Sequence, residues 1–202
     1  GVAGVVLAAG AGTRMGRPKA EIVVAGRRLL DAAVAALTDG GCDPVIAVVR
    51  DGVHVERAVP VINPDPSRGM RSSLELGIAK AAELGPDAVA VVLVDTPGID
   101  ARAVHAVVDR WQPGRVAVGR VGSRSVHPTV MTVDLWREAL VRAGADEGAR
   151  RFLAANPDLV DEVEVDGILE PDSGDKPRVR LRGRIDRLER DAEGRPVVID
   201  VK

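Results

Sequence analysis

Apolar runs and helically spaced apolar residues alternate along the first 167 residues of the chain. Five segments are apolar throughout, which is typical of strands buried on both faces of a sheet: 2–8, 45–49, 61–62, 88–94 and 116–118. Five others carry apolar residues at helical spacing: 29–38, 72–84, 101–111, 135–143 and 149–155. This alternation predicts an α/β fold, a doubly wound and mostly parallel sheet with helices on both faces.

Residues 168–202 follow a different pattern. The stretch 168–177 is rich in Pro, Gly and Asp, a composition typical of a linker. Charged and apolar residues then alternate over 178–188, and a further apolar run covers 197–201, so the two segments predict a β-hairpin. We therefore expect one domain over 1–167, followed by a linker and a hairpin appendage over 168–202.

Composition narrows the classes of partner. Among 202 residues, 46% are hydrophobic, and the aromatic residues are limited to Trp111, Trp136 and Phe152, so the core must consist of Val, Leu, Ile and Ala. A net charge of −2 gives no basic field, so no nucleic-acid partner is expected for 1–167. The single cysteine, Cys42, fits a reducing cytoplasm. No apolar run reaches the roughly 20 residues of a membrane helix. We therefore expect a cytoplasmic protein with no membrane partner.

A loop of small residues follows the first predicted strand and reads Leu-Ala-Ala-Gly-Ala-Gly-Thr-Arg-Met-Gly-Arg-Pro-Lys over 7–19. Ligands of α/β sheets bind beyond the carboxyl ends of strands, where a backbone without bulky side chains can approach a phosphate. The loop is not a Walker A loop, because Gly-Lys-Ser/Thr is missing, and it is not Gly-x-Gly-x-x-Gly, because position 15 is Met. Its glycines alone would fit an ordinary surface loop, but Arg14 and Lys19 add positive charge and favour phosphate binding.

Asp95 ends the most hydrophobic predicted strand, where a carboxylate must be solvated, paired or bound to a metal. At the carboxyl edge of the sheet it would face the glycine loop and hold Mg²⁺ against a triphosphate. The plainer alternative is that Asp95, followed by Thr96 and Pro97, begins the next helix. Together with the loop, Asp95 favours a metal site, and Mg²⁺ is the expected cofactor.

Residues 7–20 resemble the signature of the MobA-like nucleotidyltransferases, especially the molybdenum cofactor cytidylyltransferase branch. Further segments agree with that family in order and spacing: Asn63-Pro64, Gly-Met-Arg-Ser-Ser-Leu at 69–74, Val-Val-Leu-Val-Asp-Thr-Pro at 91–97, His127-Pro128 and Gly-Ala-Arg at 148–150. The resemblance covers 2–167 and implies a Rossmann-like nucleotidyltransferase fold. One departure is Val126, where the family usually has Gly before the His-Pro pair.

The resemblance also implies an activity: Mg²⁺-dependent transfer of a nucleoside monophosphate from an NTP to a small phosphorylated acceptor such as molybdopterin cofactor, with release of pyrophosphate. Ala9, where the guanylyl branch has Gly, favours CTP. The implied catalytic residues are Arg14, Lys19 and the metal ligand Asp95, and His127 is implied to contact the acceptor. The residues implied to bind the nucleotide are Leu7, Ala8, Ala9, Gly10, Gly12, Thr13, Arg14, Lys19, Ser72 and Ser73.

Several alternatives stay open at this point. Ser72 or Ser73 could instead cap the helix predicted over 72–84, and His127 could be an ordinary loop residue. Use of GTP, or transfer to a sugar phosphate, is the rival within the same enzyme class. The other classes are a non-catalytic nucleotide-binding module and a DNA-processing protein fragment.

The tail resembles a second family. Gly-Arg-Ile-Asp-Arg at 183–187 and Val-Ile-Asp-Val-Lys at 198–202 are similar to the hairpin of RecB-type PD-(D/E)XK nucleases, which implies metal binding and water activation by Asp186, Asp200 and Lys202. About 35 residues are too few for that fold, so we interpret the tail as a chimeric or truncated nuclease fragment. The carboxylate-rich segment that the MobA-like family usually has after 160–165 is replaced here, which leaves a second metal ligand open.

Overall fold

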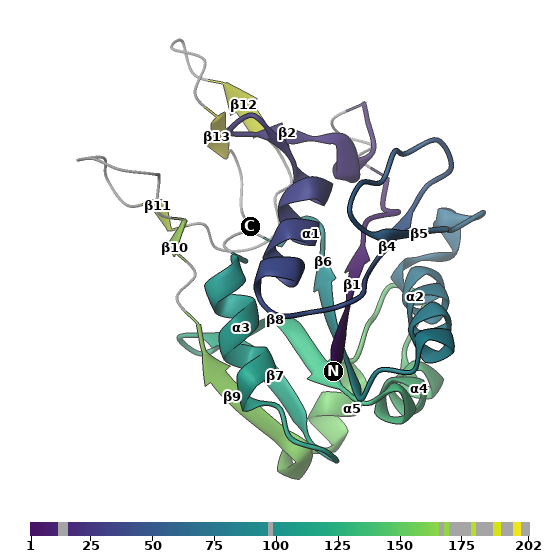
Figure 1. The fold of residues 1–202 in the computed structure, drawn as a ribbon, viewed down its shortest axis with the longest axis vertical. Helices are drawn as coiled ribbons and strands as arrows, with labels where there is room; N and C mark the ends of the chain where they lie inside the picture. The colour runs from purple at the N-terminus through teal and green to yellow at the C-terminus, as the bar shows by residue number, and fades with distance from the viewer. Residues whose placement is uncertain are drawn as a thin grey trace.

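The computed structural model describes residues 1–11, 16–96 and 99–165, together with the backbone of 168–169, 179–180, 188–190 and 196–198. One sheet of seven strands dominates it, in the order β5-β4-β1-β6-β8-β7-β9 (Figure 1). The strands are β1 Val2–Leu7, β4 Val45–Val49, β5 Val59–Ile62, β6 Ala88–Leu93, β7 Val116–Val121, β8 Arg124–Met131 and β9 Val160–Glu164. Only β8 runs against its neighbours, β6 and β7, so the predicted mostly parallel α/β sheet is confirmed.

Helices cover both faces of the sheet, as the sequence predicts for a doubly wound fold (Figure 1). They are α1 Leu29–Asp39, α2 Met70–Leu84, α3 Ala101–Arg110, α4 Val133–Arg142 and α5 Arg150–Ala155. Helices α1 and α3 pack on one face and α2, α4 and α5 on the other, which gives two hydrophobic clusters separated by the sheet. Each helix thus buries one apolar stripe against the sheet.

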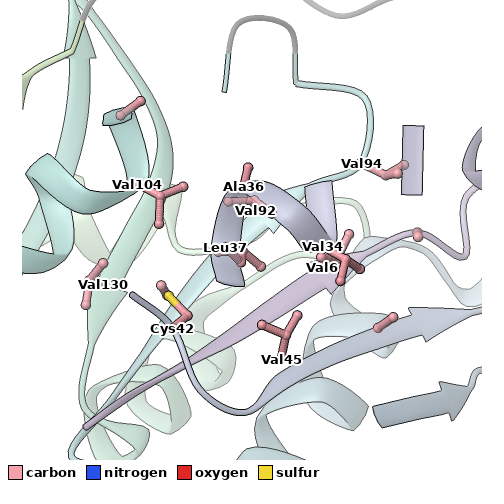
Figure 2. Close-up of a cluster of buried hydrophobic side chains, with 14 of the residues drawn as sticks. Val6, Val34, Ala36, Leu37, Cys42, Val45, Val92, Val94, Val104 and Val130 are labelled. Carbon is pink, nitrogen blue, oxygen red and sulfur yellow. The ribbon is translucent and has the colours of Figure 1, made fainter. Parts of the chain in front are cut away.

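The core is aliphatic, as the composition requires. Val6 and Val92 from neighbouring strands meet Val34 and Leu37 from α1 in the cluster drawn in Figure 2. Cys42 belongs to the same cluster, and its burial raises the pKa of its thiol to about 12. A thiol with that pKa stays protonated at neutral pH, so Cys42 acts as a small apolar residue and is no candidate nucleophile.

Two helix starts decide between alternatives that the sequence left open. Helix α2 begins at Met70 with Gly69 as its N-cap, and no side chain caps it, so the capping role considered for Ser72 or Ser73 is wrong. Helix α3 is capped by Asp100, whose carboxylate accepts a hydrogen bond from the N–H of Ala103 at 2.9 Å. Asp95 therefore does not begin the next helix, because Asp100 does so instead.

Strand β8 is the main element that the hydrophobic pattern missed. Its first half is polar and it contains Pro128, which cannot donate to a ladder and argues against a central strand. The register explains how the strand accommodates it: Val118 pairs with Thr129 and Gly119 with Val126, so His127 and Pro128 lie in a bulge. The short hairpin β2 Val23–Val24 and β3 Arg27–Arg28 was missed as well.

The tail keeps part of its predicted pattern. Strand β12 Leu188–Arg190 pairs with β13 Pro196–Val198 in antiparallel fashion, which confirms a hairpin, although it begins about ten residues later than predicted. Strand β11 Val179–Arg180 pairs instead with β10 Ile168–Leu169. The residues of the nuclease-like motif, Asp186, Asp200 and Lys202, lie outside the described residues. In the described part of the chain, every helix is too short or too polar to span a bilayer.

Candidate functional site

The candidate site lies where three neighbouring strands end at the carboxyl edge of the sheet. Residues 8–11 follow β1, Arg50 follows β4 and Asp95 follows β6. Backbone hydrogen bonds hold these exits together, because the N–H of Ala8 donates to the carbonyl of Val48 at 2.8 Å and the N–H of Val94 to that of Leu7 at 3.1 Å. Side chains that are far apart in sequence therefore meet at one edge.

Lys19 and Asp95 form an ion pair at this edge. Nζ of Lys19 lies 2.8 Å from Oδ2 of Asp95, and the side chains are 26% and 9% exposed. Lys19 begins a short 3₁₀ turn whose next residue, Ala20, is completely buried, so the position of Lys19 is anchored in the core. The two charged residues that the sequence placed at a triphosphate and its metal thus lie side by side.

A small pocket of about 140 Å³ opens at this ion pair. Its lining comes from the β1 exit, the β6 exit, the Lys19 turn and the start of α2: Leu7, Ala9, Gly10, Lys19, Pro66, Gly69, Met70, Ser73, Leu93, Val94 and Asp95. The side chain of Ala8 is absent from this lining because it points into the core on the other face of the sheet. Gly12, Thr13 and Arg14 lie outside the described residues.

Ser72 and Ser73 have different surroundings despite being neighbours. Nδ2 of the buried Asn63 donates to both hydroxyl oxygens at 2.9 Å. The hydroxyl of Ser72 in turn donates to the carbonyl of Gly69 at 2.7 Å, so its bonds are used within the protein. Ser73 is the one of the two that lines the small pocket.

Arg50 is a site residue that the sequence analysis missed. Its Nε donates to the carbonyl oxygen of Ala9 at 2.9 Å, across the exits of β4 and β1. In a planar trans peptide the N–H points opposite to the C=O. The N–H of Gly10 is therefore directed away from Arg50. A lone arginine after a strand carries no motif that would have marked it.

The start of α2 is fixed to the loop that precedes α5. The backbone N–H of Arg71 donates to the carbonyl of Ala145, and its guanidinium donates to that of Ala143, both at 3.0 Å. Gly69 adopts a φ of +94°, and a side chain there would overlap the carbonyl of Ala145. Glycine is thus required at this position for its conformation and for the close approach.

A larger cavity of about 1000 Å³ adjoins the small pocket, with which it shares Leu7, Met70 and Leu93. It lies against the sheet face that carries α2, α4 and α5 and is lined by Trp136, Leu153 and Val160 among others. His127 lines it too, and its Nδ1 donates to the carbonyl of Val91 at 3.2 Å. The residue assigned to the acceptor from sequence therefore borders a cavity that continues from the Lys19–Asp95 pocket.

The described lining of the small pocket offers a divalent ion one protein carboxylate, that of Asp95. Within the described residues, no cluster of three or more His, Cys, Asp or Glu side chains could by itself hold a metal ion. A single carboxylate fits Mg²⁺ only where phosphate oxygens and water complete its coordination, which is how this ion commonly binds with nucleotides.

This chain is similar to a known domain family and to several curated proteins. Residues 4–161 match the model of the MobA-like NTP transferase domain. Nicotine blue oxidoreductase from Paenarthrobacter nicotinovorans is 35% identical over 178 residues, which cover 81% of this chain and 86% of that protein. A probable molybdenum cofactor guanylyltransferase from Opitutus terrae is 33% identical over 121 residues, 59% of this chain and 60% of that protein.

A similar fold occurs in Rv0371c from Mycobacterium tuberculosis, solved in complex with manganese, at a TM-score of 0.66 and 22% identity over 82% of this chain and 88% of that chain. These matches give no support to the nuclease resemblance of the tail, and the family match ends at residue 161.

Proposed function

Because the chain belongs to the MobA-like NTP transferase domain family, we propose that it transfers a nucleoside monophosphate from an NTP to a small phosphorylated acceptor, with release of pyrophosphate. The observation that carries this proposal is the ion pair of Lys19 and Asp95 in a pocket at the carboxyl edge of the sheet, beside the glycine loop. An anchored cation and a carboxylate in one small pocket suit a polyphosphate and its divalent ion.

Asp95 is the residue that would hold Mg²⁺, and bound Mg²⁺ would supply positive charge to the triphosphate. The manganese complex of Rv0371c supports use of a divalent ion within this fold. Lys19 neutralises Asp95 and lines the same pocket. When a phosphate enters, Lys19 is placed to exchange the carboxylate for phosphate oxygens.

Catalysis by this site would rest on alignment and charge. An acceptor phosphate is already ionised at neutral pH, so no general base has to be found among the side chains. Lys19 and the N–H of Gly10 would stabilise negative charge on the phosphates, and Arg14 would add to it. The single buried thiol of Cys42 fits a reducing cytoplasm, where we place the reaction.

CTP is the favoured nucleotide and molybdopterin cofactor the favoured acceptor, on the sequence resemblance and on Ala9. The relative named as a guanylyltransferase makes GTP the direct rival. We expect CTP with Mg²⁺ to raise the melting temperature by about 5–10 °C at a concentration about 100 times its Kd, because a ligand that binds only the folded state stabilises it. The measurement is thermal unfolding with each of the four NTPs, with and without Mg²⁺. A larger shift with GTP would reassign the base, and no shift with any NTP would contradict the proposed site.

An oxidoreductase is the second candidate, because the relative with that name matches 81% of this chain. The two functions are separable in one experiment. Pyrophosphate release from CTP and molybdenum cofactor is expected of a nucleotidyltransferase. Oxidation of NADH or NADPH by an added two-electron acceptor such as a quinone, without NTP, is expected of an oxidoreductase.

Replacing Arg50 with Met is expected to weaken binding of Mg²⁺–CTP about tenfold, since the Ala9–Gly10 peptide at the pocket loses the hydrogen bond that fixes its orientation. Arg50→Lys keeps a donor and should lose less. Titration calorimetry measures both, with Arg142→Met, at the exposed end of α4, as the control. Equal affinities in all four proteins would remove Arg50 from the site.

A further inference from the structure

Thr129 is a buried polar residue whose hydroxyl is unused. It lies in the middle of β8, is only 5% exposed and lines the large cavity. Its sheet neighbours are apolar, because it pairs with Val91 of β6 and Val118 of β7, both of which also line the cavity. Among the described residues, no side chain or backbone group forms a hydrogen bond with its hydroxyl.

Among the described residues, Nε of Arg120 is the side-chain polar atom that is fully buried without a hydrogen-bond partner, so the Thr129 hydroxyl is open to the cavity. Valine has nearly the same shape as threonine and lacks the hydroxyl. The positions that pair with Thr129 on the neighbouring strands, and the next residue of β8, are all valine. Threonine therefore gains no hydrogen bond from the described residues, and a hydrogen-bonding ligand in the cavity would supply one.

The cavity wall indicates the chemistry of that ligand. Several of its acidic residues are already neutralised by arginines: Asp161 by Arg115 at 2.6 Å and Glu147 by Arg151 at 2.8 Å. The floor around Thr129 is apolar. Such a wall suits an uncharged body with hydrogen-bonding groups, while the charged end of the ligand lies toward Lys19, across the shared residues Met70 and Leu93.

We propose that Thr129 is a specificity-determining residue of the acceptor site, where its hydroxyl forms a hydrogen bond with an uncharged polar group on the body of the acceptor. This proposal rests on the proposed function in taking the second ligand of the cavity to be the acceptor. The nucleotide does not contact Thr129, because Thr129 lines the large cavity and not the pocket of Lys19 and Asp95.

Thr129→Val and Thr129→Ser form the test, because valine removes the hydroxyl and serine retains it. With Mg²⁺–CTP and molybdenum cofactor as substrates, we expect Thr129→Val to raise the KM for the cofactor about tenfold with little change in kcat, and Thr129→Ser to stay close to the wild type. Binding of Mg²⁺–CTP should be the same in all three proteins. Thr38→Val is the control, since the Thr38 hydroxyl already donates to the carbonyl of Val34 at 2.9 Å, away from the cavity.

Thermal unfolding without ligand gives a readout that needs no acceptor. The Thr129→Val protein should melt at the wild-type temperature or above it, because no hydrogen bond is lost. A clearly lower melting temperature would overturn the proposal by showing a structural partner for the hydroxyl, and so would an unchanged KM. Failure of the wild type to bind any NTP would refute the proposed function instead. The comparison of melting temperatures would still show whether the Thr129 hydroxyl has a hydrogen-bond partner within the protein.

Discussion

Replacing Asp95 with Asn is expected to lower the rate of pyrophosphate release by about 10²-fold or more, because the amide keeps the shape of the carboxylate but lacks the charge that would hold a divalent ion at the triphosphate. The variant also leaves the ammonium of Lys19 without its partner at 2.8 Å. The measurement is steady-state pyrophosphate release with CTP and molybdenum cofactor over a range of Mg²⁺ concentrations.

The control for this prediction is Asp134→Asn, which removes an exposed carboxylate that pairs with Arg137 at the start of α4. Its rate should equal that of the wild type. Thermal unfolding of both variants establishes that they are folded. Turnover of the Asp95→Asn protein within a few-fold of the wild type would exclude Asp95 as the metal ligand.

Replacing Lys19 with Met is expected to have two effects of opposite sign. Turnover should fall by about 10²-fold or more, because a cation that contacts the phosphates is lost. Binding of Mn²⁺ without nucleotide should become tighter, because the nearly buried carboxylate of Asp95 is no longer neutralised by an ammonium. Electron paramagnetic resonance of free and bound Mn²⁺ measures the second effect.

Lys80→Met is the matched control, since Lys80 pairs with Glu83 on the exposed surface of α2. It should change neither turnover nor Mn²⁺ affinity. A Lys19→Met protein that loses activity and binds Mn²⁺ no better than the wild type would speak against competition between Lys19 and the metal for Asp95. Tighter Mn²⁺ binding with normal turnover would remove Lys19 from catalysis.

The fold was predictable from sequence wherever the chain is buried on both faces. Strands β1 and β6 are continuous apolar runs. Ligands of α/β sheets bind beyond the carboxyl ends of strands, so the residues that follow these two strands, Lys19 and Asp95 among them, could be predicted as site residues. The element boundaries were less predictable: α2 begins at Met70, where Gly69 supplies the required positive φ, and β7 continues to Val121.

The remainder depends on contacts between distant segments. Strand β8 was missed because Pro128 breaks its pattern, and only the bulge in its register makes the strand possible. Arg50 and Thr129 were missed for a related reason. Each is a single polar residue at or in a strand, and its importance follows from the Ala9 carbonyl or from the cavity wall beside it.

The reversed direction of β8 has a consequence for how such a protein can diversify. Because β8 runs against β6 and β7, the hairpin that joins β7 to β8 lies at the same edge as the exits of β1 and β6. Its tip, at Gly122 and Ser123, is exposed. Residues can therefore be inserted or deleted there without disturbing the aliphatic clusters. A lineage can thus reshape the hairpin that leads into the cavity-lining residues 125–127 of β8 while leaving the Lys19 turn intact, a route by which one scaffold can serve relatives with differently named chemistries.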